Sequence, residues 1–194
     1  MKTDVVLAGV GGQGVLSIAA IIAVAAVDSG LYLKQTEVHG MSQRGGAVQS
    51  HLRVADRPIH SDLIADGTAD LLIAMEPMEA LRYLPSLAAG GAVVTERAPL
   101  VNIPDYPPLD AVYAALEALP RVWIVDAEAI ARDMRASRAA NVVLLGAAAP
   151  FLPVATEALE AAIGVVFGRK GETVVEQNLA AFRRGRAVTA AAGN

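Results

Sequence analysis

Residues 1–27 constrain the fold most, because an apolar run meets three spaced glycines and then a long apolar segment. Residues 4–8 (Asp-Val-Val-Leu-Ala) lead into Gly9-x-Gly11-x-x-Gly14, and residues 15–27 consist mainly of Ala, Ile and Val. A short apolar run that ends in a glycine turn is typical of a buried strand, and the longer segment after it is typical of a helix packed on that strand. The sequence therefore predicts a strand–turn–helix unit at the start of an α/β fold.

The glycine turn is a candidate anion-binding site. In such turns the first glycine allows a tight bend, the second lets a phosphate approach the backbone, and the third lets the helix pack close to the strand. The N–H groups at the helix start favour a negative charge. We therefore expect a cofactor-binding turn that comprises Gly9, Gly11, Gly12, Gln13 and Gly14. The alternative is a turn that only packs the helix on the strand.

A dinucleotide-binding domain needs one further residue, and the sequence supplies it poorly. An Asp or Glu should end the second strand, roughly 20 residues beyond the turn, to bind a ribose hydroxyl. The second strand is predicted at residues 31–34, but Gln35 follows it and Glu37 falls within a predicted loop. An autonomous NAD(P)-binding oxidoreductase is therefore an alternative interpretation. A module that senses an adenine nucleotide without chemistry is another.

The predicted loop at residues 35–46 reads Gln-Thr-Glu-Val-His-Gly-Met-Ser-Gln-Arg-Gly-Gly. Imidazole and guanidinium groups supply hydrogen-bond donors, and glycine lets a backbone come close to a ligand or a partner subunit. His39 and Arg44 are the candidates for a catalytic role, although neither is assigned one. Glu37, Ser42, Gln43 and Arg44 are expected to face the substrate or a partner. The alternative is a surface loop whose glycines only permit its turns.

The rest of the chain alternates between strand and helix signals. Strands are predicted at residues 47–54, 71–75, 92–95 and 122–125. Helices are predicted at residues 77–87, closed by Gly90 and Gly91, and at residues 110–119, capped by Asp110. A further helix is predicted after its cap at Asp126, and others lie within residues 137–186 with breaks at Pro150, Pro153 and Gly168. This alternation predicts a doubly wound, mostly parallel, Rossmann-like sheet with helices on both faces and a helical C-terminal part. The length favours one domain over residues 1–194.

Three polar clusters follow predicted strands: the glycine turn, residues 37–46, and Glu76. Ligands of such sheets bind outside the carboxyl ends of the strands. We therefore expect these clusters to gather at one edge of the sheet, with Glu76 facing substrate or partner. Alternatively, Glu76 only caps the helix that Pro77 begins.

Composition excludes several classes of site and location. The chain has no cysteine, so it has no disulfide, no zinc-thiolate site, no Cys nucleophile and no Cys-ligated iron–sulfur cluster of its own. No metal site is predicted, and a net charge of −4 argues against a nucleic-acid partner. Residues 15–27 are shorter than the roughly 20 residues that a bilayer requires, and no signal peptide is present, so we expect a cytoplasmic protein.

The apolar content suggests a partner chain. Hydrophobic residues make up 54% of the chain and charged residues only 19%. Apolar side chains in excess of what one core can hold are often covered by another subunit. We therefore expect this chain to be a subunit rather than a free monomer.

The sequence resembles the gamma-type subunit of 2-oxoacid:ferredoxin oxidoreductases, and most of all the small (beta) subunit of the indolepyruvate ferredoxin oxidoreductase branch. The resemblance spans nearly the whole chain. It is carried by Gly-Val-Gly-Gly-Gln-Gly-Val-Leu at residues 9–16, Glu-Val-His-Gly-Met-Ser-Gln-Arg-Gly-Gly at 37–46, Ser-His-Leu-Arg at 50–53, Glu-Pro-Met-Glu-Ala-Leu-Arg at 76–82, Asn-Val-Val-Leu-Leu-Gly at 141–146 and the helix at 178–185. The segment at 37–46 indicates the aryl-pyruvate branch.

This resemblance implies a function. Such a complex decarboxylates indolepyruvate or another aryl-pyruvate oxidatively, forms an acyl-CoA and reduces ferredoxin. Thiamine diphosphate and iron–sulfur clusters would belong to a large partner subunit, which agrees with the missing cysteines. This chain would be the subunit that does not bind thiamine, and coenzyme A is a co-substrate that it would contact. By the same resemblance Gly11, Gly12, Gln13 and Gly14 face an anion, whereas His39, Ser42, Gln43 and Arg44 face the partner and the substrate.

Overall fold

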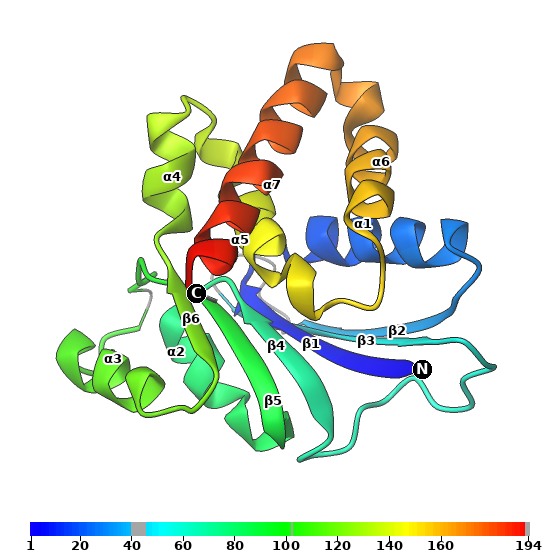
Figure 1. The fold of residues 1–194 in the computed structure, drawn as a ribbon. Coiled ribbons are helices and arrows are strands. Elements are labelled where there is room, and N and C mark those ends of the chain that lie inside the picture. The colour runs from blue at the N-terminus through cyan, green and yellow to red at the C-terminus, as the bar shows by residue number, and fades with distance from the viewer. Residues whose placement is uncertain (40–45, 102, 193–194) are drawn as a thin grey trace.

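The sheet is organised around the N-terminal strand. The computed structural model describes residues 1–39, 46–101 and 103–192. Within these residues six strands form one sheet: β1 (Lys2–Val10), β2 (Tyr32–His39), β3 (Ala47–Ala55), β4 (Ala69–Ala74), β5 (Leu87–Glu96) and β6 (Val122–Val125). Their spatial order is β2-β3-β1-β4-β5-β6 (Figure 1). Residues 4–10 of β1 are buried, as expected for a central strand that is covered on both faces.

Most strand pairs are parallel, as predicted. β4 pairs in parallel with β1 and with β5, and β5 pairs in parallel with β6. β3 is antiparallel to both β1 and β2. Because β3 lies between them, β2 runs in the same direction as β1 without touching it. The carboxyl ends of β1, β2, β4, β5 and β6 therefore lie at the same edge of the sheet.

The second strand is longer than predicted. Residues 35–39, which were assigned to a loop, continue β2 and pair with residues 48–52 of β3. β2 is the outermost strand, and Gln35 and Glu37 are exposed on it. An edge strand with solvated side chains lacks the apolar alternation by which strands are recognised, and so the sequence pattern missed this part of it.

The helices complete the layers. They are α1 (Val15–Asp28), α2 (Pro77–Arg82), α3 (Leu109–Glu117), α4 (Ala127–Asp133), α5 (Ala140–Ala148), α6 (Thr156–Phe167) and α7 (Glu172–Ala192), and short 3-10 turns lie at Leu84–Ser86, Ser137–Ala139, Ala149–Phe151 and Gly168–Lys170. The long apolar helix after the glycine turn is confirmed, as are the breaks at Pro150, Pro153 and Gly168. Asp126 caps α4 through the N–H of Ala129, as predicted.

Two predicted helix boundaries were wrong. The helix that begins at Pro77 ends at Arg82 rather than near residue 87, because Pro85 cannot donate a hydrogen bond within a continuing helix. Gly90 and Gly91 therefore lie within β5 rather than at a helix end. Asp110 does not cap α3; Pro108 holds the cap position and Asp110 lies in the first turn.

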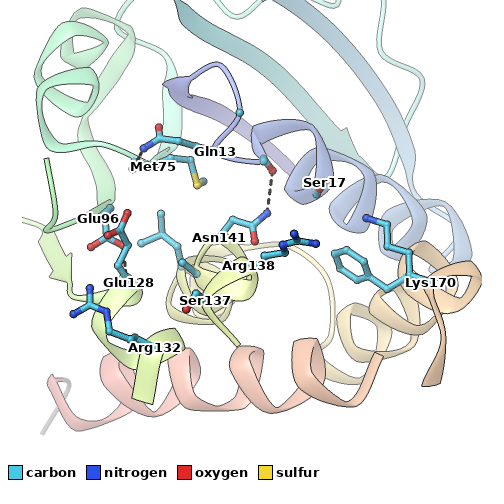
Figure 2. Close-up of a pocket in the computed structure, with 15 residues that line it drawn as sticks. Gln13, Ser17, Met75, Glu96, Glu128, Arg132, Ser137, Arg138, Asn141 and Lys170 are labelled. Atoms are coloured by element: carbon cyan, nitrogen blue, oxygen red, sulfur yellow. Dashed lines mark hydrogen bonds between the residues drawn. The ribbon is translucent and has the colours of Figure 1, made fainter. Parts of the chain in front are cut away.

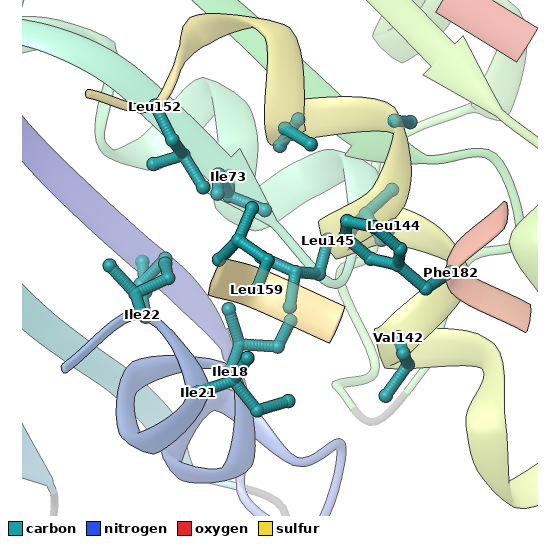
Figure 3. Packing of buried hydrophobic residues seen from close by; sticks show 14 of the residues in the cluster. Ile18, Ile21, Ile22, Ile73, Val142, Leu144, Leu145, Leu152, Leu159 and Phe182 are labelled. Atoms are coloured by element: carbon teal, nitrogen blue, oxygen red, sulfur yellow. The ribbon is translucent and has the colours of Figure 1, made fainter. Parts of the chain in front are cut away.

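Each face of the sheet has its own core. On one face α1, α5 and α6 pack with α7 over strands β1, β3, β4 and β5, and Figure 3 shows Ile18, Ile73, Leu145, Leu159 and Phe182 meeting there. On the other face α2 and α3 cover β1, β4 and β5. Helices thus lie on both faces, as predicted (Figure 1).

Candidate functional site

The glycine turn joins β1 to α1 in a conformation that needs glycine. Gly12 has φ +106° and Gly14 has φ +87°, which is the left-handed region that side chains disfavour. A Cβ on Gly9 would lie 3.0 Å from Cβ of Met75 and 3.0 Å from Cγ2 of Val15. The side-chain amide of Asn141 donates to the Gly14 carbonyl oxygen at 3.2 Å. The turn is therefore held closely against β4 and α5.

Gln13 fastens the turn to two strand ends. Its Oε1 accepts a hydrogen bond from the Val10 N–H at 2.8 Å, and its Nε2 donates to the Met75 carbonyl oxygen at 3.1 Å. This side chain bridges the carboxyl ends of β1 and β4, so its visible role is to shape the turn.

Several N–H groups of the turn have no acceptor in the part of the chain that the structure describes. The Gly11 N–H, which was expected to approach an anion, donates to the Gly46 carbonyl oxygen at 2.9 Å, and the Gln13 N–H donates to Val10. The N–H groups without an acceptor among the described residues are those of Gly12, Gly14, Val15 and Leu16. α1 has no acidic residue in its first turn and no side-chain cap. Such a helix start attracts an anion through its N–H groups and its dipole.

A cavity of about 690 Å³ opens beside this turn (Figure 2). Its walls come from the glycine turn and α1, the ends of β4 and β5, α4, the start of α5 and the end of α6. The polar side chains that line it include Gln13, Ser17, Glu96, Glu128, Arg132, Ser137, Arg138, Asn141 and Lys170. In Figure 2 the carboxylates Glu96 and Glu128 lie at one end, Lys170 lies at the other, and Asn141 lies between them.

Glu96 is the most buried charged group of the cavity wall, with 4% of its surface exposed. Its Oε1 accepts from the N–H groups of Arg97 at 2.8 Å and Ala98 at 2.9 Å, and its Oε2 accepts from the Glu128 N–H at 3.2 Å. Burial raises the pKa of Glu96 to about 7, even though these three N–H groups oppose the shift. The carboxyl group therefore changes charge near neutral pH.

The expected gathering of strand ends is confirmed for the turn and for residues 37–39 and 46, which are the described part of the segment at residues 37–46. His39 ends β2 opposite Val48, and the bond from Gly11 to Gly46 brings the end of that segment against the turn. Glu37 is exposed on β2. Ser42, Gln43 and Arg44 lie outside the described residues, so their predicted roles remain predictions, as does that of His39.

Glu76 lies apart from this cavity. It is 1% exposed, and it accepts from the N–H of Glu79 at 2.9 Å, from the N–H of Leu100 at 3.3 Å and from the hydroxyl of Tyr106. Glu76 therefore caps α2, and its predicted role of facing the substrate or a partner remains a prediction. Its bonds to Leu100 and Tyr106 also fasten the connection between β5 and α3.

Sequence reasoning missed the residues that give the cavity its charge. Arg132, Arg138 and Lys170 come from three separate segments, and no local motif links them. Glu96 did carry a signal, because it directly follows the predicted strand at residues 92–95, just as Glu76 follows the strand before it. The rule that ligands bind at the carboxyl ends of strands applies equally to both residues.

Metal-binding clusters and membrane-spanning helices are both absent from the described residues. No group of three or more His, Asp or Glu residues in that part of the chain could hold a metal ion. No helix within it is long and apolar enough to cross a membrane.

Comparisons with known proteins agree with the resemblance seen in the sequence. The family model for pyruvate ferredoxin/flavodoxin oxidoreductase matches residues 4–188. The chain belongs to this family. Indolepyruvate oxidoreductase subunit IorB of Archaeoglobus fulgidus is 37% identical over 194 aligned positions. The alignment covers 95% of this chain and 94% of that protein.

Solved structures share the fold. The gamma subunit of a keto/oxoacid ferredoxin oxidoreductase from Geobacter sulfurreducens superposes with a TM-score of 0.72 at 28% identity, over 97% of this chain and 99% of that one. The 2-oxoglutarate:ferredoxin oxidoreductase from Magnetococcus marinus gives a TM-score of 0.79 at 23% identity, over 98% of this chain and 31% of that one. The chain with the present sequence is therefore a small subunit of a 2-oxoacid:ferredoxin oxidoreductase.

Proposed function

We propose that this chain, as one domain over residues 1–194, is the subunit of an indolepyruvate ferredoxin oxidoreductase that does not bind thiamine. The observation that carries the proposal is the likeness to IorB proteins, which are 37% and 36% identical in Archaeoglobus fulgidus and Methanothermobacter thermautotrophicus. Relatives named as 2-oxoglutarate synthase subunits are less similar, at 28% identity over a comparable length. Indolepyruvate, or another aryl-pyruvate, is therefore the substrate class that we favour.

The reaction of the whole complex balances simply. A 2-oxoacid and coenzyme A give an acyl-CoA, carbon dioxide, a proton and two electrons, which two one-electron ferredoxin molecules accept. Thiamine diphosphate and the iron–sulfur clusters would reside in a large partner subunit. The absence of cysteine here fits this division, because such clusters are held mainly by cysteine thiolates.

The cavity suits part of coenzyme A. The open N–H groups of Gly12 and Gly14, at the positive end of α1, are suited to a pyrophosphate. Arg138 and Lys170 line the same cavity, and neither forms an ion pair with another described residue. These two cations would bind a further phosphate. At about 690 Å³ the cavity is within the usual size range of ligand sites.

The segment from His39 to Arg44 would face the partner and the substrate. His39 ends β2 at the edge where β1 and β4 also end, and Gly46, which follows the segment, accepts a hydrogen bond from the Gly11 N–H of the glycine turn. A guanidinium such as that of Arg44 can bind a carboxylate or a phosphate through two parallel hydrogen bonds. Glu37 on β2 would also face the partner.

The NAD(P)-dependent alternative is not favoured. In a dinucleotide-binding sheet the second strand is the parallel neighbour of the first, and its acidic end residue reaches the ribose. Here β3 separates β2 from β1, so Glu37 does not occupy that position.

The test is a substrate panel on the purified complex. We expect kcat/KM for ferredoxin reduction with indolepyruvate to exceed the values with pyruvate and 2-oxoglutarate at least tenfold, because a pocket shaped for an aromatic side chain gains apolar contacts that small acids lack. A preference for 2-oxoglutarate or pyruvate would contradict the substrate assignment and leave the subunit assignment intact.

A further inference from the structure

Glu96 has a hydrogen-bonding position that no donor of the described residues fills. An ionised carboxylate offers about four acceptor positions, two on each oxygen. The N–H groups of Arg97 and Ala98 fill both positions on Oε1, and the Glu128 N–H fills one on Oε2. The second position on Oε2 has no donor among the described residues.

The described residues also give this carboxylate no cation to offset its burial. Only 4% of its surface is exposed, and no Lys or Arg among them forms an ion pair with it. Its raised pKa reflects this loss of solvation. A buried charge without a counter-ion is costly, and it is a frequent mark of a binding or catalytic position. A ligand that donates a hydrogen bond to Oε2 would lower this cost.

The arrangement of the cavity indicates what such a ligand carries. Glu96 shares the wall with the open end of α1, where an anion is favoured, while Arg138 and Lys170 supply positive charge elsewhere on the wall (Figure 2). One molecule that satisfies both positions needs an anionic group and a hydrogen-bond donor. Phosphorylated sugars have both features, because their hydroxyl groups are donors.

We propose that Glu96 is a ligand-binding residue that accepts a hydrogen bond from a sugar hydroxyl, while the phosphate of the same ligand binds at Gly12 and Gly14. This inference rests on the anion site proposed above. It adds an assignment that sequence motifs did not provide: a carboxylate at the end of β5, rather than at the end of β2, selects the sugar. The sugar phosphate belongs either to a nucleotide or to a free sugar phosphate.

The test compares ligands that differ only in their hydroxyl groups. Isothermal titration of the full 194-residue chain at pH 8 and without divalent cations would use ADP, 2′,3′-dideoxy-ADP and ribose 5-phosphate. We expect ADP to bind about tenfold more tightly than its dideoxy analogue, since a hydrogen bond to a charged group contributes about that much. Similar affinity for ribose 5-phosphate and ADP would identify a free sugar phosphate, and much weaker affinity would identify a nucleotide.

Glu96→Gln should remove the preference for ADP over 2′,3′-dideoxy-ADP, because an amide NH₂ group replaces one carboxylate oxygen. Glu117→Gln is the matched control: it makes the same chemical change at an exposed residue of α3, on the other face of the sheet. It should keep the wild-type ratio of the two dissociation constants. If Glu96→Gln does not give a folded protein by circular dichroism, Glu96→Asp takes its place and should weaken the preference.

Three results would overturn the inference. They are equal affinity of the wild type for ADP and dideoxy-ADP, no binding of either, and an unchanged preference in the Glu96 variant. The proposed function is tested separately, by turnover of indolepyruvate in the complex. If the complex oxidises indolepyruvate but this chain binds ADP and dideoxy-ADP with equal affinity, only the inference about Glu96 is contradicted.

Discussion

At the scale of single residues, Glu96 links the stability of the fold to pH. Its ordinary pKa is 4.5, and burial raises the pKa to about 7 in the folded chain. Between these values the folded state keeps a proton that the unfolded state has released. The free energy of unfolding therefore falls as the pH rises through this window, by up to about 3 kcal/mol, and is constant above it with respect to this group.

Glu96→Gln should flatten this dependence, because glutamine does not titrate. Urea unfolding of both proteins at pH 5, 6, 7 and 8 would measure it. The wild type should lose more stability than the variant between pH 5 and pH 8. Parallel curves would contradict the raised pKa of Glu96.

Arg44 belongs to the same scale, although it lies outside the described residues. Arg44→Ala should lower kcat/KM of the complex at least tenfold, because a lost bidentate contact to a charged ligand costs about that much or more. Arg57→Ala, which removes an exposed arginine from the connection after β3, is the control and should leave kcat/KM unchanged. Equal activity of the two variants, with equal assembly, would rule out a ligand contact for Arg44.

At the scale of elements, two glycines set how closely α5 and α7 approach each other. A Cβ on Gly146 would overlap the carbonyl oxygen of Phe182, and a Cβ on Gly185 would overlap that of Val143. Backbone atoms cannot move away from such an overlap without shifting a whole helix. The two helices therefore depend on small residues at this crossing.

Gly146→Ala should destabilise the fold by about 3 kcal/mol, since overpacking within a rigid helix contact costs 1–3 kcal/mol and occasionally more. Gly164→Ala in α6 is the matched control, because beyond the adjacent backbone of α6 no atom of the described residues lies within 4 Å of its added Cβ. That change should stabilise the fold by about 0.5–1 kcal/mol through helix propensity. Urea unfolding measures the stability of both variants. A Gly146→Ala variant as stable as the wild type would contradict the close approach of α5 and α7.

The sequence predicted some helices and strands correctly and missed parts of others. β1 and β4 were recognised because burial on both faces of the sheet produces apolar runs. α1 and β6 were recognised because each is also an apolar run with clear boundaries. The second half of β2 was missed because an edge strand keeps polar side chains in solvent. The length of α2 was misjudged because the turn at Pro85 interrupts a segment that otherwise has helical composition.

At the scale of the whole molecule, the sheet brings together side chains that the sequence keeps apart. One cavity is lined by residues from the glycine turn, β5, α4, α5 and the turn after α6. Of these, the sequence predicted only the glycine turn as part of a site. The predicted edge of the sheet was correct because parallel strands end together. The opposite wall depends on how α4, α5 and α6 pack, which no local pattern encodes.

The surface agrees with a subunit role. Leu100, Val101 and Ile103 are exposed by 40%, 63% and 41% in the connection between β5 and α3. Exposed apolar side chains in a row are typical of surfaces that meet another protein. That a partner chain covers them remains a prediction.

The most direct measurement is reconstitution of activity. The large subunit from the same host would be purified without this chain and assayed for ferredoxin reduction by indolepyruvate with coenzyme A, before and after this chain is added. The account predicts little activity at first and full activity at a stoichiometric amount of added chain. Full activity without the chain, or no activity with it while the chain alone binds NAD, would contradict its assignment as a subunit of this oxidoreductase.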